Sequence, residues 1–204
     1  MHKLKLYHFS ENSISIFKSY LSNRKQCVKH KHITSKNLEI TSGVPQGSIL
    51  GPLLFLIYIN DIAYETRSGN IDIYADDSTL FEADFNIRSL QNKLQFNLNK
   101  VSDWCTLNNM ALHPMKTKCM VITSNQERIN KISLQLKLTI GDSVIENVFS
   151  QTILGVEVDD TLSWKIHLNI VCSKISNKIM LFKKINYYLS DEMKTMFYNS
   201  YILT

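Results

Sequence analysis

The sequence contains few of the residues that build linkers and no apolar run long enough to span a membrane. Six glycines and three prolines in 204 residues argue against long flexible linkers between domains. The longest apolar run, Ile49–Ile59, has 11 residues, whereas a membrane-spanning helix needs roughly 20. Residues 1–5 lead into no apolar stretch with a small-residue cleavage site, so no secretory signal is expected. We therefore predict an intracellular protein without a membrane segment.

Cysteine is also sparse. The four cysteines, Cys27, Cys105, Cys119 and Cys172, are far apart and form no Cys-x-x-Cys pair. We expect reduced thiols that are mostly buried. The remaining composition, 44% hydrophobic and 10% aromatic, is that of an ordinary globular protein with one domain or two small ones.

Charge is unevenly distributed along the chain. Residues 1–40 hold eight Lys or Arg and two acidic residues, residues 61–84 hold one Arg and seven acidic residues, and residues 161–190 hold five Lys and no acidic residue. Basic segments suit a polyanion such as nucleic acid, and the acidic segment would repel one unless a cation were bound there. The alternative is that these segments are simply solvated surfaces.

The hydrophobic pattern predicts a mixture of helices and strands, that is, an α+β fold. Helices are expected over residues 13–21, 49–64, 87–106 and 164–189, with a shorter helix capped by Ser190. Strands are expected over residues 38–41, 71–74, 78–81, 116–123, 136–140, 143–148 and 152–158. The helix over 49–64, with Ser48 as its N-cap, is apolar on nearly every side, so we expect it to be buried.

Two adjacent carboxylates, Asp76 and Asp77, are the first candidates for chemistry. Adjacent carboxylates repel each other, and a divalent cation that prefers oxygen ligands, Mg²⁺ above all, relieves that repulsion. On a straight strand the two side chains would point to opposite faces, whereas a turn over residues 75–78 can bring both to one side. Such a pair suits two-metal phosphoryl or nucleotidyl transfer. The alternative is an acidic turn on the surface.

A second candidate is the glycine-bearing loop before the apolar helix. Its residues of interest are Gly43, Pro45, Gln46, Gly47 and Ser48. The glycines let the backbone approach a ligand closely, and the N-terminus of the following helix favours an anion. Gln46 can donate and accept hydrogen bonds in one contact. A strand-to-helix loop without a ligand is the alternative. Lys116, the third candidate, can neutralise or protonate a departing phosphate, although a lone lysine is usually a solvent-exposed structural residue.

In combination these residues resemble the reverse transcriptases of non-LTR (LINE-type) retrotransposons, particularly the Jockey-like group. The resemblance rests on five segments in the family's order, namely Phe17–Gln26, Thr41–Phe55, Tyr74–Asp77, Lys116–Lys118, and Leu154–Val156 with Asp159, Leu162, Trp164 and His167. In the family, these are respectively the helix and loop after the first catalytic motif, the template- and nucleotide-positioning motif, the metal-binding pair, the lysine facing the triphosphate, and the primer grip with the start of the thumb.

The resemblance implies a right-hand polymerase palm, an α+β fold with an antiparallel sheet and packed helices, over residues 1–160, and the start of a helical thumb over residues 161–204. The site residues that it implies are Gly43, Pro45, Gln46, Gly47, Ser48, Tyr74 and Ala75 for nucleotide or template binding, Asp76 and Asp77 for metal binding and catalysis, Lys116 for catalysis, and Leu154, Gly155 and Val156 for the primer grip. The implied reaction extends a DNA primer on an RNA template from deoxynucleoside triphosphates with Mg²⁺. The implied setting is a ribonucleoprotein in the nucleus or cytoplasm.

The sequence also departs from the family pattern. The family's other metal-binding aspartate lies upstream of the Phe17 helix, and Glu11 and Glu39, the two acidic residues before Gly43, are not in that motif. The fingers, the endonuclease and the rest of the thumb have no counterpart, and His113 stands where relatives usually have Asn. We therefore expect a truncated fragment with an incomplete two-metal site that is inactive alone. The alternatives are a non-catalytic nucleic-acid-binding module and a functionless relic.

Overall fold

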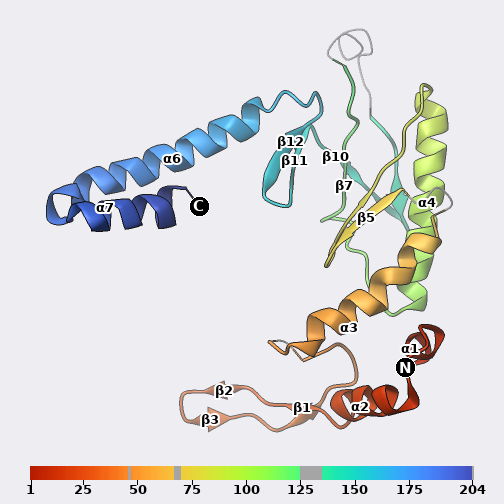
Figure 1. Ribbon diagram of the computed structural model, residues 1–204. Coiled ribbons are helices and arrows are strands. Elements are labelled where there is room, and N and C mark those ends of the chain that lie inside the picture. The colour runs from red at the N-terminus through yellow and green to blue at the C-terminus, as the bar shows by residue number, and fades with distance from the viewer. Residues whose placement is uncertain (46, 67–69, 125–134, 204) are drawn as a thin grey trace. The chain divides into compact units, whose positions relative to one another are not determined.

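The computed structural model of the chain describes residues 1–45, 47–66, 70–124 and 135–203. Two compact units form, and Figure 1 labels the larger of their elements. The first unit comprises Met1–Phe85 and Asn92–Ala111, and the second comprises Asn86–Gln91 and Leu112–Thr204. The division predicted between residues 160 and 161 is a different one, and it stays a prediction.

The first unit contains helices and three antiparallel strand pairs. Two of these pairs lie in its N-terminal half, and the third is the hairpin over residues 71–80. Its elements are α1 (His2–Leu6), α2 (Glu11–Leu21), β1 (Lys25–Gln26), β2 (Lys29–His30), β3 (Ile33–Thr34), β4 (Leu38–Glu39), α3 (Leu50–Ile59), the 3-10 helix η1 (Asn60–Tyr64), β5 (Ile71–Tyr74), β6 (Asp77–Leu80) and most of α4 (Ile87–Leu107). Strand β1 pairs with β4 and β2 with β3, which together make a two-stranded ribbon over residues 24–40 that we call the arm (Figure 1). The helices predicted over 13–21 and 87–106 are confirmed.

Side-chain caps explain where two helices of this unit begin. Ser10 precedes α2, and its hydroxyl accepts a hydrogen bond from the Ser13 amide at 3.3 Å, so the helix starts two residues before the predicted position. The prediction that Ser48 is the N-cap of α3 is wrong, because Ile49 holds that position. The Ser48 hydroxyl still accepts a hydrogen bond from the Gly51 amide at 3.0 Å and so satisfies one donor of the first turn.

Helix α3 is less buried than its sequence predicts. Gly51, Leu54 and Ile59 are buried, whereas Leu53 and Leu56 are each 49% exposed. The helix is apolar all round, but within the described residues only one side of it is covered. The expectation of a buried helix is therefore wrong for the other side.

The core of the first unit joins segments that are far apart in the sequence. Its buried apolar residues are Leu4, Ile14, Leu54, Ile59, Ile62, Ile71, Leu98, Val101, Trp104 and Cys105. Lys3 fastens α1 to this core, because its ammonium group lies 2.7 Å from Asp61 Oδ1 and 4.5 Å from the centres of the Tyr58 and Trp104 rings.

The second unit consists of short strand pairs followed by helices. Its elements after the first turn of α4 are β7 (Lys118–Cys119), β8 (Thr139–Ile140), β9 (Ser143–Val144), β10 (Glu146–Asn147), β11 (Ser150–Ile153), β12 (Val156–Asp159), α6 (Lys165–Ile185), η2 (Asn186–Tyr188), α7 (Asp191–Phe197) and η3 (Tyr198–Ile202). The predicted hairpin around Gly141 is confirmed by the β8–β9 pair. So are the long helix and the cap at Ser190, whose hydroxyl accepts a hydrogen bond from the Met193 amide.

Four strand predictions in this unit are wrong in extent. The segment 136–140 forms a strand only at β8, and 143–148 is divided into β9 and β10, which pair with different strands. The segment 152–158 is not one strand, because Leu154 and Gly155 adopt φ values of +49° and +84° and turn the chain between β11 and β12. Strand β7 is shorter than the predicted 116–123, because the amides of Lys116 and Thr117 both donate to the His113 carbonyl in a turn. Turn geometry, rather than apolar pattern, sets the latter two boundaries.

The cysteines divide equally between buried and exposed positions. Cys105 and Cys119 are buried, and burial raises the pKa of both thiols, which favours the protonated form. Cys27 and Cys172 are exposed, so the expectation of mostly buried thiols is wrong for these two. Among the described residues, no helix combines the length and the apolar character needed to cross a bilayer.

Candidate active site

The two adjacent aspartates lie at the tip of the β5–β6 hairpin. Tyr74 and Asp77 face each other as the last residue pair of the ladder, and Ala75 and Asp76 form the turn. Ala75 adopts a φ of +54°, a left-handed conformation that lets two residues reverse the chain. The predicted hairpin tip is therefore confirmed, with Asp77 as the first residue of β6. Both carboxylates are exposed, and within the described residues neither makes a hydrogen bond or an ion pair.

The glycine-bearing loop before α3 is held from within by one side chain. The Ser48 hydroxyl donates to the Pro45 carbonyl at 2.8 Å and accepts from the Gly51 amide at 3.0 Å. A Cβ atom on Gly51 would lie 2.9 Å from the Ser48 hydroxyl and 3.0 Å from the Pro45 carbonyl, so only glycine fits without a shift. Gly43 and Gly47 have φ values of +73° and +75°, which glycine adopts at little cost. Gln46 lies outside the described residues.

The loop and the hairpin tip line one concavity of about 550 Å³. Ala75 and Asp76 contribute from the hairpin, and the loop contributes Pro45, Gly47 and Ser48. Apolar side chains complete the wall, among them Ile49, which is 95% exposed. It is an open depression with mostly apolar walls rather than an enclosed cavity. The structure thus brings together two of the three candidates that the sequence indicates.

The oxygen donors of this concavity suit a hard divalent cation but are few. Carboxylate oxygens are the ligands that Mg²⁺ prefers. In the part of the chain that the structure describes, no group of three or more His, Cys, Asp or Glu side chains is placed to hold a metal ion. Asp76 and Asp77 carry the donor type that such an ion prefers, and the described residues supply no third acidic ligand beside them.

The remaining candidates belong to the second unit. Lys116 is exposed and lies in the turn before β7, where its amide donates to the His113 carbonyl at 3.0 Å. Leu154 and Gly155 form the tip of the β11–β12 hairpin, and Val156 is the first residue of β12. The positive φ values of Leu154 and Gly155 are those of a type I′ turn, and the Leu154 side chain is 57% exposed.

Comparison with known proteins shows the family. A model of the family described as "Reverse transcriptase (RNA-dependent DNA polymerase)" matches residues 1–158. The chain belongs to the reverse transcriptase family. The resemblance stated from the sequence is therefore confirmed.

Relatives of this reverse transcriptase chain include proteins of mobile elements from fruit flies. It is 25% identical over 203 residues to the RNA-directed DNA polymerase from mobile element jockey of Drosophila melanogaster, covering 90% of this chain and 22% of the relative. It is 27% identical over 192 residues to the polymerase of the same name from Drosophila funebris, covering 91% and 20%. A probable RNA-directed DNA polymerase from transposon BS of D. melanogaster is 29% identical over 163 residues, covering 75% and 17%. The chain thus spans about a fifth of the length of these relatives. No solved structure matches.

Asp159 is a residue of this reverse transcriptase chain whose contacts the sequence did not predict. Its carboxylate accepts hydrogen bonds from the amides of Thr161, Ser163 and Trp164 at 3.0–3.1 Å and from the hydroxyls of Thr161 and Ser163 at 2.7 and 3.1 Å. These bonds hold the pKa of the carboxyl well below its usual range, the Ser163 amide foremost. Leu162 and Trp164 have positive φ values within this turn. Asp159 therefore fixes the connection from β12 to α6.

Proposed function

We propose that the chain carries part of the polymerising site of an RNA-directed DNA polymerase from a non-LTR retrotransposon. The observation that carries the proposal is the concavity shared by the Gly43–Ser48 loop and the Asp76 turn. In this proposal residues 1–160 are part of a right-hand palm, and residues 161–204 begin a helical thumb. The RNA template, DNA primer and deoxynucleoside triphosphates are its proposed partners.

Each group of residues has a distinct proposed task. Asp76 and Asp77 would hold Mg²⁺, which when bound helps to activate the primer hydroxyl and to neutralise the triphosphate. The left-handed glycines Gly43 and Gly47 let the loop backbone approach the nucleotide, and the apolar wall of the concavity offers a surface for a base. Lys116 is proposed to face the triphosphate, and Leu154, Gly155 and Val156 are proposed to position the primer.

Metal binding in the presence of nucleotide tests the proposal directly. Mn²⁺ can replace Mg²⁺ at oxygen-ligand sites, and electron paramagnetic resonance measures how much of it stays free. We expect Mn²⁺ to bind the full chain more tightly with a deoxynucleoside triphosphate than without it. The variants Asp76→Asn and Asp77→Asn should each lose at least tenfold in affinity.

A matched control exists in the second unit. Asp142 is an exposed carboxylate in the turn of the β8–β9 hairpin, next to a left-handed glycine. Asp142→Asn removes the same charge from the same kind of turn, so it should leave Mn²⁺ affinity unchanged. Equal losses in all three variants, or none in any, would contradict a metal site at Asp76 and Asp77.

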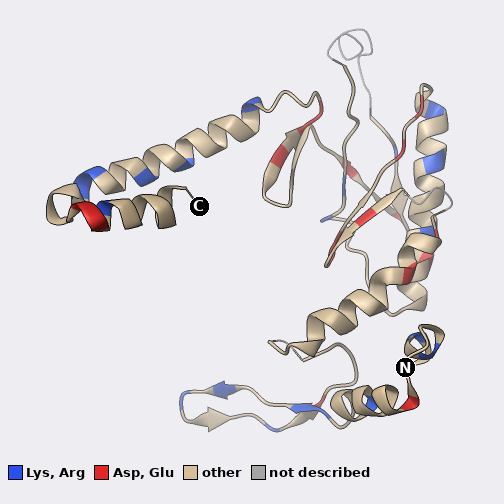
Figure 2. Cartoon of the chain, viewed as in Figure 1, with Lys and Arg blue, Asp and Glu red and all other residues tan. Residues whose placement is uncertain are grey.

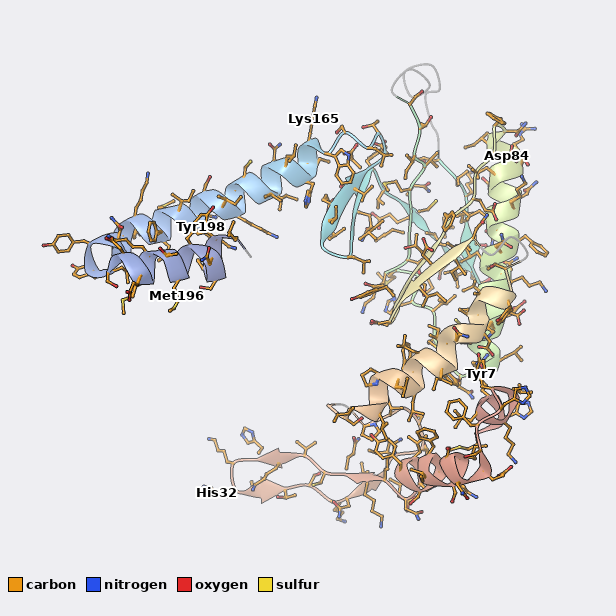
Figure 3. All side chains as sticks on the ribbon, viewed as in Figure 1. Tyr7, His32, Asp84, Lys165, Met196 and Tyr198 are labelled. Carbon is orange, nitrogen blue, oxygen red and sulfur yellow. The ribbon has the colours of Figure 1, made fainter. Side chains whose placement is uncertain are left out.

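A second candidate function is non-catalytic binding of nucleic acid, and the arm favours it. Lys25, Lys29, Lys31 and Lys36 are exposed, and within the described residues none of them has an ion-pair partner. Figure 2 shows Lys and Arg along the arm, and Figure 3 shows His32 at its tip. Free lysines on a projecting ribbon can reach a phosphate backbone without first breaking a salt bridge. This function does not depend on a complete metal site.

A further inference from the structure

Arg24 connects three parts of the first unit through carbonyl groups. It is the first residue of the arm and lies between the end of α2 and the start of β1. Its Nε donates to the Leu21 carbonyl at 3.1 Å, and its Nη2 donates to the carbonyls of Ser42 and Gly43 at 3.2 and 2.5 Å. Its own carbonyl accepts a hydrogen bond from the Ile40 amide at 2.9 Å. One residue thus joins the helix C-terminus, the base of the arm and the first residues of the glycine-bearing loop.

These bonds fix the end of the loop that Ser48 does not fix. Ser48 holds the far end through Pro45 and Gly51. Arg24 holds the near end through Ser42 and Gly43. Gly43, at the Arg24 attachment, and Gly47, within the segment that Ser48 links to Pro45, adopt left-handed conformations that the local sequence does not enforce, because glycine adopts either hand with similar ease. A loop with this freedom needs an external attachment to keep one backbone course beside Asp76.

Only an arginine can make this set of contacts. The guanidinium group presents five N–H donors in a planar fork, so Nε and Nη2 can bond separate carbonyls at once. A lysine ammonium is a single point at the end of a flexible stem and reaches fewer of them. The side chain of Arg24 has no carboxylate partner among the described ion pairs, so its bonds are directed to the backbone.

We infer that Arg24 is a positioning residue for the nucleotide-binding loop. By holding the Ser42 and Gly43 carbonyls, it sets the course of the backbone that leads into Val44 and Pro45, which line the concavity that Asp76 shares. It acts through the loop and is not among the residues that line the concavity. The role in nucleotide binding rests on the proposed function, whereas the role in loop geometry does not.

The six glycines of the chain make the inference measurable by ¹H–¹⁵N NMR of the full chain. The amides of Gly43, Gly47 and Gly51 report the loop, and those of Gly141 and Gly155 report hairpins of the second unit. In Arg24→Ala we expect the three loop signals to shift or broaden while the two hairpin signals stay in place. In Arg24→Lys the loop signals should move less far in the same direction.

Chemical rescue and a matched arginine separate positioning from general destabilisation. Ethylguanidinium added to Arg24→Ala should return the loop signals toward their wild-type positions, whereas ethylammonium should not. Arg88 is an exposed arginine in α4, and Arg88→Ala should leave all five glycine signals unchanged. If Arg24→Ala does not fold, Arg24→Lys and Arg24→Gln decide the matter by the same signals.

Nucleotide titration then links loop geometry to binding. With Mg²⁺ present, a deoxynucleoside triphosphate should bind Arg24→Ala about tenfold more weakly than the wild-type chain, and ethylguanidinium should restore most of the loss. Unchanged loop signals in Arg24→Ala, or failure of rescue, would overturn the positioning role. If the wild-type chain binds no nucleotide, the proposed function fails instead, and the glycine signals still decide whether Arg24 fixes the loop.

Discussion

Asp159 and the Asp76–Asp77 pair occupy similar places, at the end or the tip of a two-residue-turn hairpin, yet they have opposite surroundings. Asp159 is 5% exposed and accepts five hydrogen bonds from Thr161, Ser163 and Trp164. Asp76 and Asp77 are exposed and accept none within the described residues. A carboxylate whose acceptor capacity is filled by its own chain stabilises structure. One whose capacity is open is available to a ligand, so the surroundings of Asp159 indicate a structural role, and those of the pair are compatible with the binding role that we propose.

The largest expected effect concerns activity and follows from the open pair. Two carboxylates are an incomplete set for two-metal catalysis, and loss of one charged ligand commonly lowers the rate by about three powers of ten or more. The purified chain should therefore show little or no primer extension on an RNA template with Mg²⁺. Extension should be measured with a labelled DNA primer and gel separation. Robust incorporation that Asp76→Ala abolishes would show that another carboxylate completes the site.

The next effect concerns stability. Here substitution of Asp159 should have a larger effect than substitution of Asp76 or Asp77, the opposite of the order expected for activity. In the wild-type chain the donors bond to two carboxylate oxygens, whereas Asp159→Asn offers them one amide oxygen. The melting temperature should therefore fall by about 5 °C or more. Asp76→Asn and Asp77→Asn should change it by no more than about 2 °C, since neither carboxylate has a partner to lose in the described part of the chain. Differential scanning calorimetry of the three variants measures this. Equal shifts at all three positions would remove the distinction between filled and open carboxylates.

The pH dependence of stability sharpens the same distinction. Hydrogen bonds from Ser163 and Thr161 lower the pKa of Asp159 below that of an unfolded aspartate, which is about 3.9. The lowered pKa therefore stabilises the folded state at pH values above about 3.9. This stabilisation is lost as the pH falls below about 3.9 toward the pKa of Asp159 in the folded state. Between pH 5 and about 3 the wild-type chain should lose more stability than Asp159→Asn. Parallel pH profiles would show that the Asp159 bonds do not stabilise the folded chain.

The candidate residues differ in how well their local structure could be predicted from the sequence. The hairpin at Asp76 was predictable because two β-rich segments flank the short stretch of residues 75–77, although Asp77 itself belongs to β6. The Leu154–Gly155 turn was not, because leucine rarely takes a positive φ and Asn-Gly or Asp-Gly is the usual signal. The roles of Lys116 and of the primer-grip residues stay predictions.

The contacts that hold the loop lay beyond sequence reasoning for a different reason. Arg24 bonds Ser42 and Gly43 at sequence separations of 18 and 19, and no periodic pattern encodes such a bond. The limited burial of α3 could not be predicted from the sequence either. An apolar surface indicates that a helix can be buried, but it does not indicate how many of its sides are buried. Local patterns predicted elements, and contacts over long sequence separations required the structure.

The smallest expected effect distinguishes free from paired lysines in nucleic-acid binding. Lys29→Ala with Lys31→Ala removes two arm lysines that have no ion-pair partner among the residues that the structure describes. Lys93→Ala with Lys118→Ala removes two lysines that pair with Asp84 and Glu146, and it changes the net charge by the same amount.

For an RNA–DNA duplex titrated from low to physiological salt, affinity should fall with a log–log slope near −0.9 per phosphate neutralised. We expect the arm variant to reduce the magnitude of that slope by about 1 to 2, while the paired variant leaves it nearly unchanged. Fluorescence anisotropy with a labelled duplex gives both slopes. If both variants weaken binding equally, net charge rather than the arm determines affinity. If the affinity of the wild-type chain does not depend on salt, the arm does not bind nucleic acid as proposed.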